Sequence, residues 1–172
     1  MTWVYIVGGI VALLGFSVFF GAPYVPSRRR DLVRMFDELY PLKSSDVLID
    51  VGSGDGIILR EASRRGATAI GYEINPVLVA LSNWLSRRDE KVSVAIANFW
   101  LAKFPQATTV VYAFSVERDA VKLRNKLQTE ANRLNKPLNL ICYGSPLPDI
   151  IPERDFEAYH LYQFYPLQVR EA

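Results

Sequence analysis

Hydrophobic and polar positions divide the chain into an uncharged N-terminal stretch and a longer body of alternating patterns. From residue 3 to residue 21 the sequence WVYIVGGIVALLGFSVFFG contains no charged side chain. A helix rises about 1.5 Å per residue, so this stretch is just long enough to cross roughly 30 Å of hydrocarbon. The pattern predicts a transmembrane anchor over residues 1–22, followed by a separate domain over residues 23–172.

Charges around the apolar stretch predict its orientation. No basic residue precedes it, whereas four arginines follow it within residues 28–34. Basic residues favour the cytoplasmic side, so we expect a single-pass membrane protein with its domain in the cytoplasm, or in the matrix if the protein is mitochondrial. A cleaved signal peptide is an alternative, although it usually has a basic start and a shorter apolar core. A buried or surface-lying helix is another.

The body alternates between strand-like and helix-like patterns. Apolar or alternating runs rich in β-formers predict six strands, at residues 47–51, 67–73, 91–100, 108–114, 138–144 and 158–165. Helical spacing predicts a short helix capped by Ser27 and longer helices at residues 57–65, 76–88 and 116–135. Strands separated by helices indicate an α/β fold, Rossmann-like, with a mostly parallel sheet and helices on both faces. Ligands of such folds bind at the carboxyl ends of the strands.

Composition narrows the chemistry that this fold can perform. The 172 residues carry 20 basic and 18 acidic side chains, a formal net charge of +2, which gives no signature of nucleic-acid binding. One Cys and one His exclude an intrachain disulfide and make a metal site unexpected. We interpret Cys142 as an apolar core residue and His160 as structural.

The sequence DVGSGDG at residues 50–56 follows the first predicted strand of the domain. It is not the dinucleotide fingerprint G-x-G-x-x-G, because Ile57 stands where the third glycine belongs, and no phosphate-loop G-K-[ST] is present. Asp50 and Asp55 would repel a pyrophosphate, since unit charges about 4 Å apart interact by roughly 4 kcal/mol at an effective dielectric constant of 20. The turn therefore favours a cationic ligand, such as a nucleoside that carries a sulfonium and an ammonium group.

This turn resembles the first motif of class I S-adenosylmethionine-dependent methyltransferases. In that superfamily the glycines allow the backbone to approach the cofactor, and an acid at the position of Asp50 helps to hold its methionine amino group. An acid at the end of the second strand binds the ribose, and Glu73 matches it. Asn98 and Phe99 stand where adenine is contacted. The resemblance implies S-adenosylmethionine as cofactor and this set of binding residues: Asp50, Gly52, Ser53, Gly54, Asp55, Gly56, Glu73, Asn98 and Phe99.

Each of these signals also has a purely structural interpretation. The glycines could form only a tight turn, and Glu73 could cap the helix that starts after Asn75. Asn98 could be a turn residue, and Phe99 and Trp100 could belong to the core. An NAD-binding site is a further alternative, weakened by the missing third glycine.

A narrower resemblance covers nearly the whole chain. The apolar segment with APYVPS, DVGSGDG, GYEINPVLV, NFW and CYGSPLP resembles the small membrane-anchored protein-lysine methyltransferases related to the mitochondrial ATP synthase c-subunit lysine methyltransferase. It implies N-methylation of a lysine in a membrane protein, with the lipid bilayer as a second partner and neither nucleic acid nor metal. The family commonly has Asp where Asn98 stands, and residues 144–152 match only loosely.

Three functions therefore remain open on the sequence alone. Methylation of a lipid or quinone would explain an anchor equally well, and the domain could be a non-catalytic nucleotide-binding module that tethers partners through the helix at residues 116–135. The N/D-P-P-Y/F signature of many amino-group methyltransferases is missing, so no catalytic residue is assigned. Candidates for contacting the acceptor are Tyr24, Ser27, Tyr112, Ser115, Tyr143 and Ser145.

Overall fold

One mixed sheet organises the part of the chain that the computed structural model describes, which comprises residues 2–5, 8 and 29–167. Its seven strands lie in the order β3-β2-β1-β4-β5-β7-β6. They are β1 (Val47–Val51), β2 (Thr68–Glu73), β3 (Val92–Ile96), β4 (Val110–Ser115), β5 (Leu138–Gly144), β6 (Arg154–Phe156) and β7 (Tyr159–Phe164). Strands β1 to β5 are parallel, and β7 runs antiparallel to both β5 and β6. The mostly parallel sheet predicted from the βαβ pattern is confirmed.

The predicted strands are found within a few residues of their expected positions, but one strand was missed. Strand β6 has only three residues and joins β7 through a tight turn at Glu157, whose φ is +54°. Such a turn normally contains Gly or Asn, so no residue at this position signals it. The run at residues 91–100 was also predicted too long, because β3 ends at Ile96 and a turn follows.

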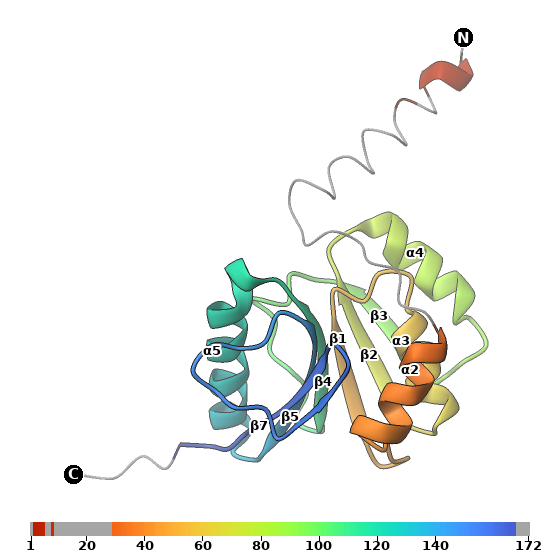
Figure 1. Ribbon diagram of the computed structural model, residues 1–172. Helices are drawn as coiled ribbons and strands as arrows, with labels where there is room; N and C mark the ends of the chain where they lie inside the picture. Colours follow the sequence, from red (N-terminus) through yellow and green to blue (C-terminus); the bar gives the residue numbers. More distant parts are fainter. Residues whose placement is uncertain (1, 6–7, 9–28, 168–172) are drawn as a thin grey trace.

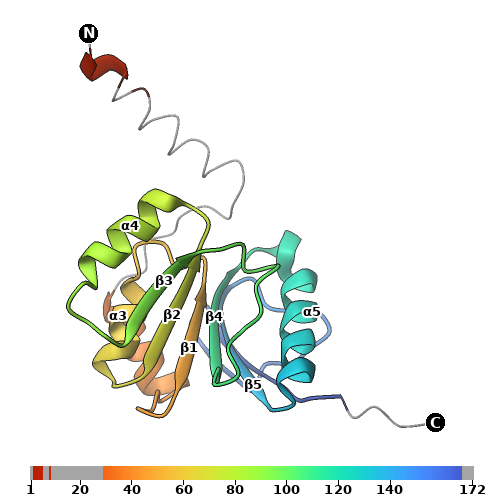
Figure 2. The ribbon, with the colours of Figure 1, turned by 180° about the vertical axis from the view of Figure 1, so that it is seen from behind.

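The helices cover both faces of the sheet, as predicted. Their bounds are α2 (Arg29–Arg34), the π-helical η1 (Met35–Leu39), α3 (Ile57–Arg64), α4 (Pro76–Leu85) and α5 (Glu117–Leu134). Figure 1 shows α2, α3 and α4 on one side of the sheet and α5 on the other, and Figure 2 shows the same layers from behind. Leu32 on α2 and Met35, Phe36 and Leu39 on η1 are buried against the sheet and α3.

Two buried glutamates tie the helices to their surroundings. Glu61 on α3 accepts hydrogen bonds from Arg29, Arg64 and Arg65. Glu130 on α5 pairs with Lys126 and Arg133 and accepts a hydrogen bond from the backbone N–H of Phe104. The Glu130 cluster thereby fixes the long connection between β3 and β4 against α5.

The predicted membrane anchor lies mostly outside the described residues. Of residues 1–22, the structure describes only residues 2–5 and 8, and Tyr24 and Ser27 are also outside it. Among the helices of the described residues, none is long and apolar enough to span a bilayer. The anchor over residues 1–22 and the domain boundary after it therefore stay predictions.

Candidate functional site

The glycine turn lies at the carboxyl edge of the sheet, between the ends of three parallel strands. Strand β1 is paired on one side with β2, where Asp50 is opposite Gly71, and on the other with β4, where Asp50 is opposite Tyr112. The turn that follows β1 therefore lies beside Glu73, the last residue of β2, and near Ser115, the last residue of β4. Figure 1 shows the turn at the end of the sheet from which α4 and α5 begin.

The backbone of the turn takes the left-handed conformations for which glycine is suited. The φ angles are +83° at Gly52, +53° at Gly54 and +79° at Gly56. A Cβ atom at Gly56 would collide with the hydroxyl of Ser82, whereas a Cβ at Gly52 would meet no atom within 4 Å. Gly56 is thus required for packing against α4, and Gly52 leaves open space beside the backbone where a ligand can approach.

Glu73 braces the glycine turn from the neighbouring strand. Its Oε2 accepts a hydrogen bond from the N–H of Gly54 at 3.0 Å, and its Oε1 accepts one from the N–H of Asn75 at 2.8 Å. Each carboxylate oxygen has two lone pairs, so both oxygens can still accept a hydrogen bond from a hydroxyl group of a ligand. The cap of α4 is supplied by Asn75, which accepts from the N–H of Val77 at 3.0 Å. Glu73 therefore fixes the turn while keeping capacity for a ligand.

Asp50 is a buried carboxylate without a complete set of partners. Its side chain is on β1 with an exposed fraction of 2%. Its Oδ2 has no hydrogen-bond partner among the described residues. Burial and the nearby charges of Glu73 and Asp55 raise the pKa of Asp50 well above its ordinary value. A cationic ligand group at this position would supply the missing hydrogen bond and counter-charge.

The other predicted residues of the turn have mainly local partners. Asp55 accepts from the N–H of Ile57 at 3.1 Å at the start of α3, and its Oδ2 lies 3.6 Å from Arg60. The Ser53 hydroxyl is buried with no hydrogen-bond partner in the described part of the chain. It packs against β2, where a Cβ at Gly71 would lie 2.5 Å from it. Gly71 thus admits Ser53, a requirement that the sequence pattern does not indicate.

Exposed apolar and polar side chains lie next to Glu73 at this edge. Ile74 directly follows Glu73 and has an exposed fraction of 53%. Asn98 is also exposed, and its Oδ1 accepts from the N–H of Trp100 at 3.1 Å, so it forms the turn after β3 and keeps its amide N–H groups for a ligand. Phe99 is partly buried against the core, with its ring 4.2 Å from that of Trp100. Ile74 was not predicted as a site residue, although an apolar residue straight after a strand-end acid was a usable signal.

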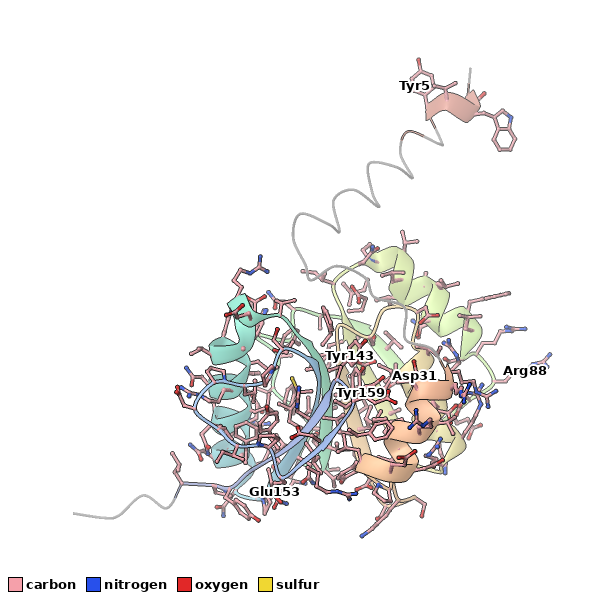
Figure 3. All side chains as sticks on the ribbon, in the orientation of Figure 1. Tyr5, Asp31, Arg88, Tyr143, Glu153 and Tyr159 are labelled. Carbon is pink, nitrogen blue, oxygen red and sulfur yellow. The ribbon has the colours of Figure 1, made fainter. Side chains whose placement is uncertain are left out.

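Aromatic side chains cluster at the ends of β4, β5 and β7. The Tyr143 ring lies 5.8 Å from that of Phe114 and 4.7 Å from that of Tyr159, and Figure 3 shows the two tyrosines next to each other. Tyr112 is buried in the adjacent core. Of the candidate acceptor contacts, Ser115 is buried at the end of β4 and Ser145 follows β5. Ser115, Tyr143 and Ser145 therefore lie at the same edge as the glycine turn, whereas Tyr112 is part of the core.

Cys142 and His160 lie away from the glycine turn. The Cys142 side chain is fully buried, and burial raises the pKa of its thiol to about 12, which agrees with the apolar interpretation. His160 Nδ1 lies 2.6 Å from Asp155 Oδ1 within the β6–β7 hairpin, as expected for a structural residue. Within residues 29–167 and the few described before them, no group of three or more His, Cys, Asp or Glu side chains is placed to hold a metal ion.

Comparisons with known proteins place these residues in a family context. The sequence profile described as "ANTKMT methyltransferase domain" matches residues 50–154, a stretch that contains all the predicted cofactor-binding residues. The chain is 33% identical over 134 residues to the ATP synthase c-subunit lysine N-methyltransferase of Homo sapiens, covering 76% of this chain and 55% of that protein. It is 31% identical over 137 residues to the Xenopus laevis protein of the same name, covering 78% and 58%. The chain thus spans little more than half the length of these relatives.

Solved structures give the same fold. An RNA methyltransferase from Salinibacter ruber in complex with S-adenosyl-L-homocysteine superposes with a TM-score of 0.71 at 26% identity, covering 86% of this chain and 98% of that one. The 23S rRNA methyltransferase ErmE superposes with a TM-score of 0.57 at 16% identity, over 70% of this chain and 48% of that one, a likeness of fold alone. The Rossmann-like fold of class I methyltransferases, predicted from the βαβ pattern and the glycine turn, is confirmed.

Proposed function

The chain belongs to the family of ANTKMT methyltransferase domains, and we propose that it is an S-adenosylmethionine-dependent enzyme that N-methylates a lysine of a membrane protein. The resemblance to class I methyltransferases stated from the sequence is confirmed by this membership. The observation that carries the proposal is Asp50, a buried carboxylate with an unsatisfied oxygen beneath a glycine turn, in a chain of a methyltransferase family.

The residues at the sheet edge fit the parts of S-adenosylmethionine one by one. Asp50 would hold the ammonium group of the methionine moiety, and Gly52 would give it room beside the backbone. Glu73, with lone pairs left on both oxygens, would accept the ribose hydroxyls. The exposed side chains of Ile74 and Asn98 would contact the face and the edge of adenine. All of these groups lie at one edge, as open α/β sheets require.

When bound, S-adenosylmethionine would supply a methyl group on a positively charged sulfur. The bond from sulfur to the methyl carbon would break as the acceptor nitrogen forms a bond to that carbon. The protein's part is to align the acceptor and to keep water away, since alignment accounts for much of the rate of such displacements. The acceptor lysine must first lose a proton. An apolar environment disfavours the ammonium form and lowers the pKa of a lysine, so a site at a membrane surface assists this step.

The acceptor is proposed from the names of the relatives and from the N-terminal sequence. The Homo sapiens and Xenopus laevis relatives are named as lysine N-methyltransferases of the ATP synthase c-subunit. The uncharged stretch at residues 3–21 supports a single-pass anchor that holds the domain at the membrane, on the cytoplasmic or matrix side. The aromatic side chains around Tyr143 offer a surface at which a lysine ammonium group can be received.

A labelling experiment tests the proposal directly. The full chain is incubated with S-adenosylmethionine carrying a labelled methyl group and with membranes of the source organism, and the products are separated into protein, organic-solvent and RNA fractions. We expect label in a membrane protein, released on hydrolysis as methyl-lysine, and much less label with the Asp50→Asn variant at a low concentration of S-adenosylmethionine. Label in the organic phase would replace the proposal with a lipid or quinone methyltransferase. Label in RNA would point to the activity named for the Salinibacter ruber structure.

A further inference from the structure

Helix α4 turns an apolar stripe toward solvent. The exposed fractions are 44% at Val77, 41% at Leu81, 60% at Trp84 and 39% at Leu85. Their spacing of four, three and one residues places them along one side of the helix, which we call the α4 stripe. The opposite side of α4 packs inward through Val79 and Ser82, so the apolar character of the stripe is not explained by the core.

Basic side chains border the C-terminal end of the α4 stripe. Arg87 and Arg88 follow the last turn of α4, both exposed, and the guanidinium of Arg87 lies 5.1 Å from the centre of the Trp84 ring. Figure 3 shows Arg88 extending outward from this end of the helix. A hollow of about 610 Å³ opens beside it, where Arg60 and Arg64 are already paired with Asp55 and Glu61. Arg87 and Arg88 have no ion pair among the described residues, so their charge is available to an anionic surface.

We propose that the α4 stripe lies in the interface of an anionic lipid bilayer, with Arg87 and Arg88 at the level of the lipid phosphates. Apolar and Trp side chains on one side of a helix, with arginines beside them, are the composition of helices that lie in the plane of a membrane. Long basic side chains reach from an apolar surface to the headgroups, and the Arg87–Trp84 contact has this form. The charge of Arg87 and Arg88 is complementary to anionic lipid and distinguishes the α4 stripe from a purely apolar docking face.

The position of α4 gives this contact a consequence for the proposed reaction, on whose membrane-protein acceptor the inference rests. Helix α4 begins three residues after Glu73, at the edge that carries the glycine turn. Figure 1 shows α4 running from that edge down the outer side of the domain. A bilayer against the α4 stripe would therefore meet the domain beside the cofactor site, where a lysine near the membrane surface can reach it.

Site-directed spin labelling tests the contact without using activity. Cys142 is the one cysteine of the chain and is fully buried, so a label attaches to an introduced cysteine. Leu81→Cys places the label on the α4 stripe, and Val121→Cys places a matched label on α5, on the other side of the sheet, at a similar exposed fraction of 48%. The full chain is reconstituted into vesicles of phosphatidylcholine with phosphatidylglycerol. Collision rates with oxygen and with a water-soluble nickel chelate report the depth of each label.

We expect the label at position 81 to collide several-fold more with oxygen than with the nickel chelate, and the label at position 121 to behave as in water. Arg87→Ala with Arg88→Ala, or vesicles of phosphatidylcholine alone, should move the first label toward water. Equal aqueous behaviour of both labels would overturn the inference. So would shielding at position 81 that needs no vesicles and rises with protein concentration, which would indicate a second copy of the chain.

A separate measurement of cofactor binding distinguishes the failure of this inference from the failure of the proposed function. Titration with S-adenosylhomocysteine by calorimetry measures the cofactor site and does not depend on lipid contact. Binding of S-adenosylhomocysteine with an aqueous label at position 81 would reject the membrane contact alone. Absence of binding in the unlabelled natural chain, with the label immersed, would reject the cofactor assignment and leave the contact standing.

Discussion

Buried carboxyl groups occur in two regions of this protein, and their pKa values are shifted in opposite directions in the two regions. Asp50 at the sheet edge and Glu61 and Glu130 on the helices all have exposed fractions of 2%. Burial alone raises the pKa of any carboxyl group. For Glu61 and Glu130, hydrogen bonds from neighbouring arginines and Lys126 outweigh burial and lower the pKa. For Asp50, burial is reinforced by nearby acids, and the pKa rises.

The difference separates carboxylates that stabilise the fold from one that is available for a ligand. A buried charge is tolerated when partners surround it, as at Glu130, and is costly when they do not. No cation of the described chain is placed against the free oxygen of Asp50, although the domain contains many arginines. The fold thus carries an unfavourable buried acid where a ligand ammonium can satisfy it, a pattern typical of functional sites.

The largest expected effect comes from breaking the paired region. Glu130→Gln removes the charge that Lys126 and Arg133 share, and Lys126 is mostly buried. We expect the free energy of unfolding to fall by about 3 kcal/mol, the usual consequence of removing one partner of a buried pair. Urea unfolding followed by circular dichroism measures this loss. A natural-like midpoint and slope in Glu130→Gln would contradict the structural role assigned to the pair.

Asp50→Asn tests the carboxyl group that lacks a partner. It should lower the affinity for the cofactor and leave the free energy of unfolding undiminished. The amide keeps the shape of the side chain but cannot form a charge-assisted hydrogen bond with an ammonium group. We expect the affinity for S-adenosylhomocysteine to fall about 10-fold to 100-fold, since such bonds contribute roughly 1.5–3 kcal/mol. The free energy of unfolding should stay equal or increase. Unchanged calorimetric affinity would reject Asp50 as the group that holds the amino end of the cofactor.

Glu130 and Asp50 should contribute opposite dependences of the free energy of unfolding on pH. The folded-state pKa of Glu130 is below its ordinary value of 4.5, so its stabilisation is complete above that pH and is lost as the pH falls through the folded pKa. The folded-state pKa of Asp50 is above its ordinary value of 3.8, so unfolding releases its proton and stability is lost as the pH rises from that value.

Each substitution should therefore flatten one limb of the pH profile. Relative to the natural chain, Glu130→Gln should lose less stability on acidification below about pH 4.5. Asp50→Asn should lose less stability as the pH rises above about 4. Thermal unfolding over a pH range that extends well to both sides of these values measures both changes. If the two variants change the same limb, the opposite treatment of the two carboxylates is wrong.

The parts of the candidate site that could be predicted from the sequence are those formed by consecutive residues. The glycine turn and its acids are one local motif, and Glu73 is fixed by the end of a recognisable strand, so their meeting at one edge followed from parallel β1 and β2. The five parallel strands and the long helix α5 were predicted for the same reason, because their periodic patterns are local.

Features that depend on neighbours across the sheet were not predictable in this way. Gly71 is required because Ser53 of the turn lies against it, a contact between residues on different elements. The free oxygen of Asp50 and the contact of Glu61 with Arg29 depend on which residues the fold brings near, whereas Arg64 on α3 and Arg65 directly after it are close to Glu61 in the sequence. That Asp50 has no such cation is visible only in the tertiary arrangement.

Substitutions of Asn98 should have the smallest effects. They test whether cofactor binding depends on the burial of Asp50 or only on the total negative charge at the sheet edge. Its side chain is exposed at the edge that also holds Asp50 and Glu73. Asn98→Asp adds an acid where the family commonly has one, and an exposed carboxylate keeps its water and shifts little in pKa. We expect affinity for S-adenosylhomocysteine within about 3-fold of the natural chain, and a change in unfolding free energy within about 0.5 kcal/mol, as for ordinary surface substitutions.

Asn98→Ala should weaken binding slightly more, because it removes an amide that can donate to adenine. If calorimetry instead gave Asn98→Asp a loss as large as that of Asp50→Asn, the total negative charge at the sheet edge, and not the missing partner of one buried acid, would govern binding.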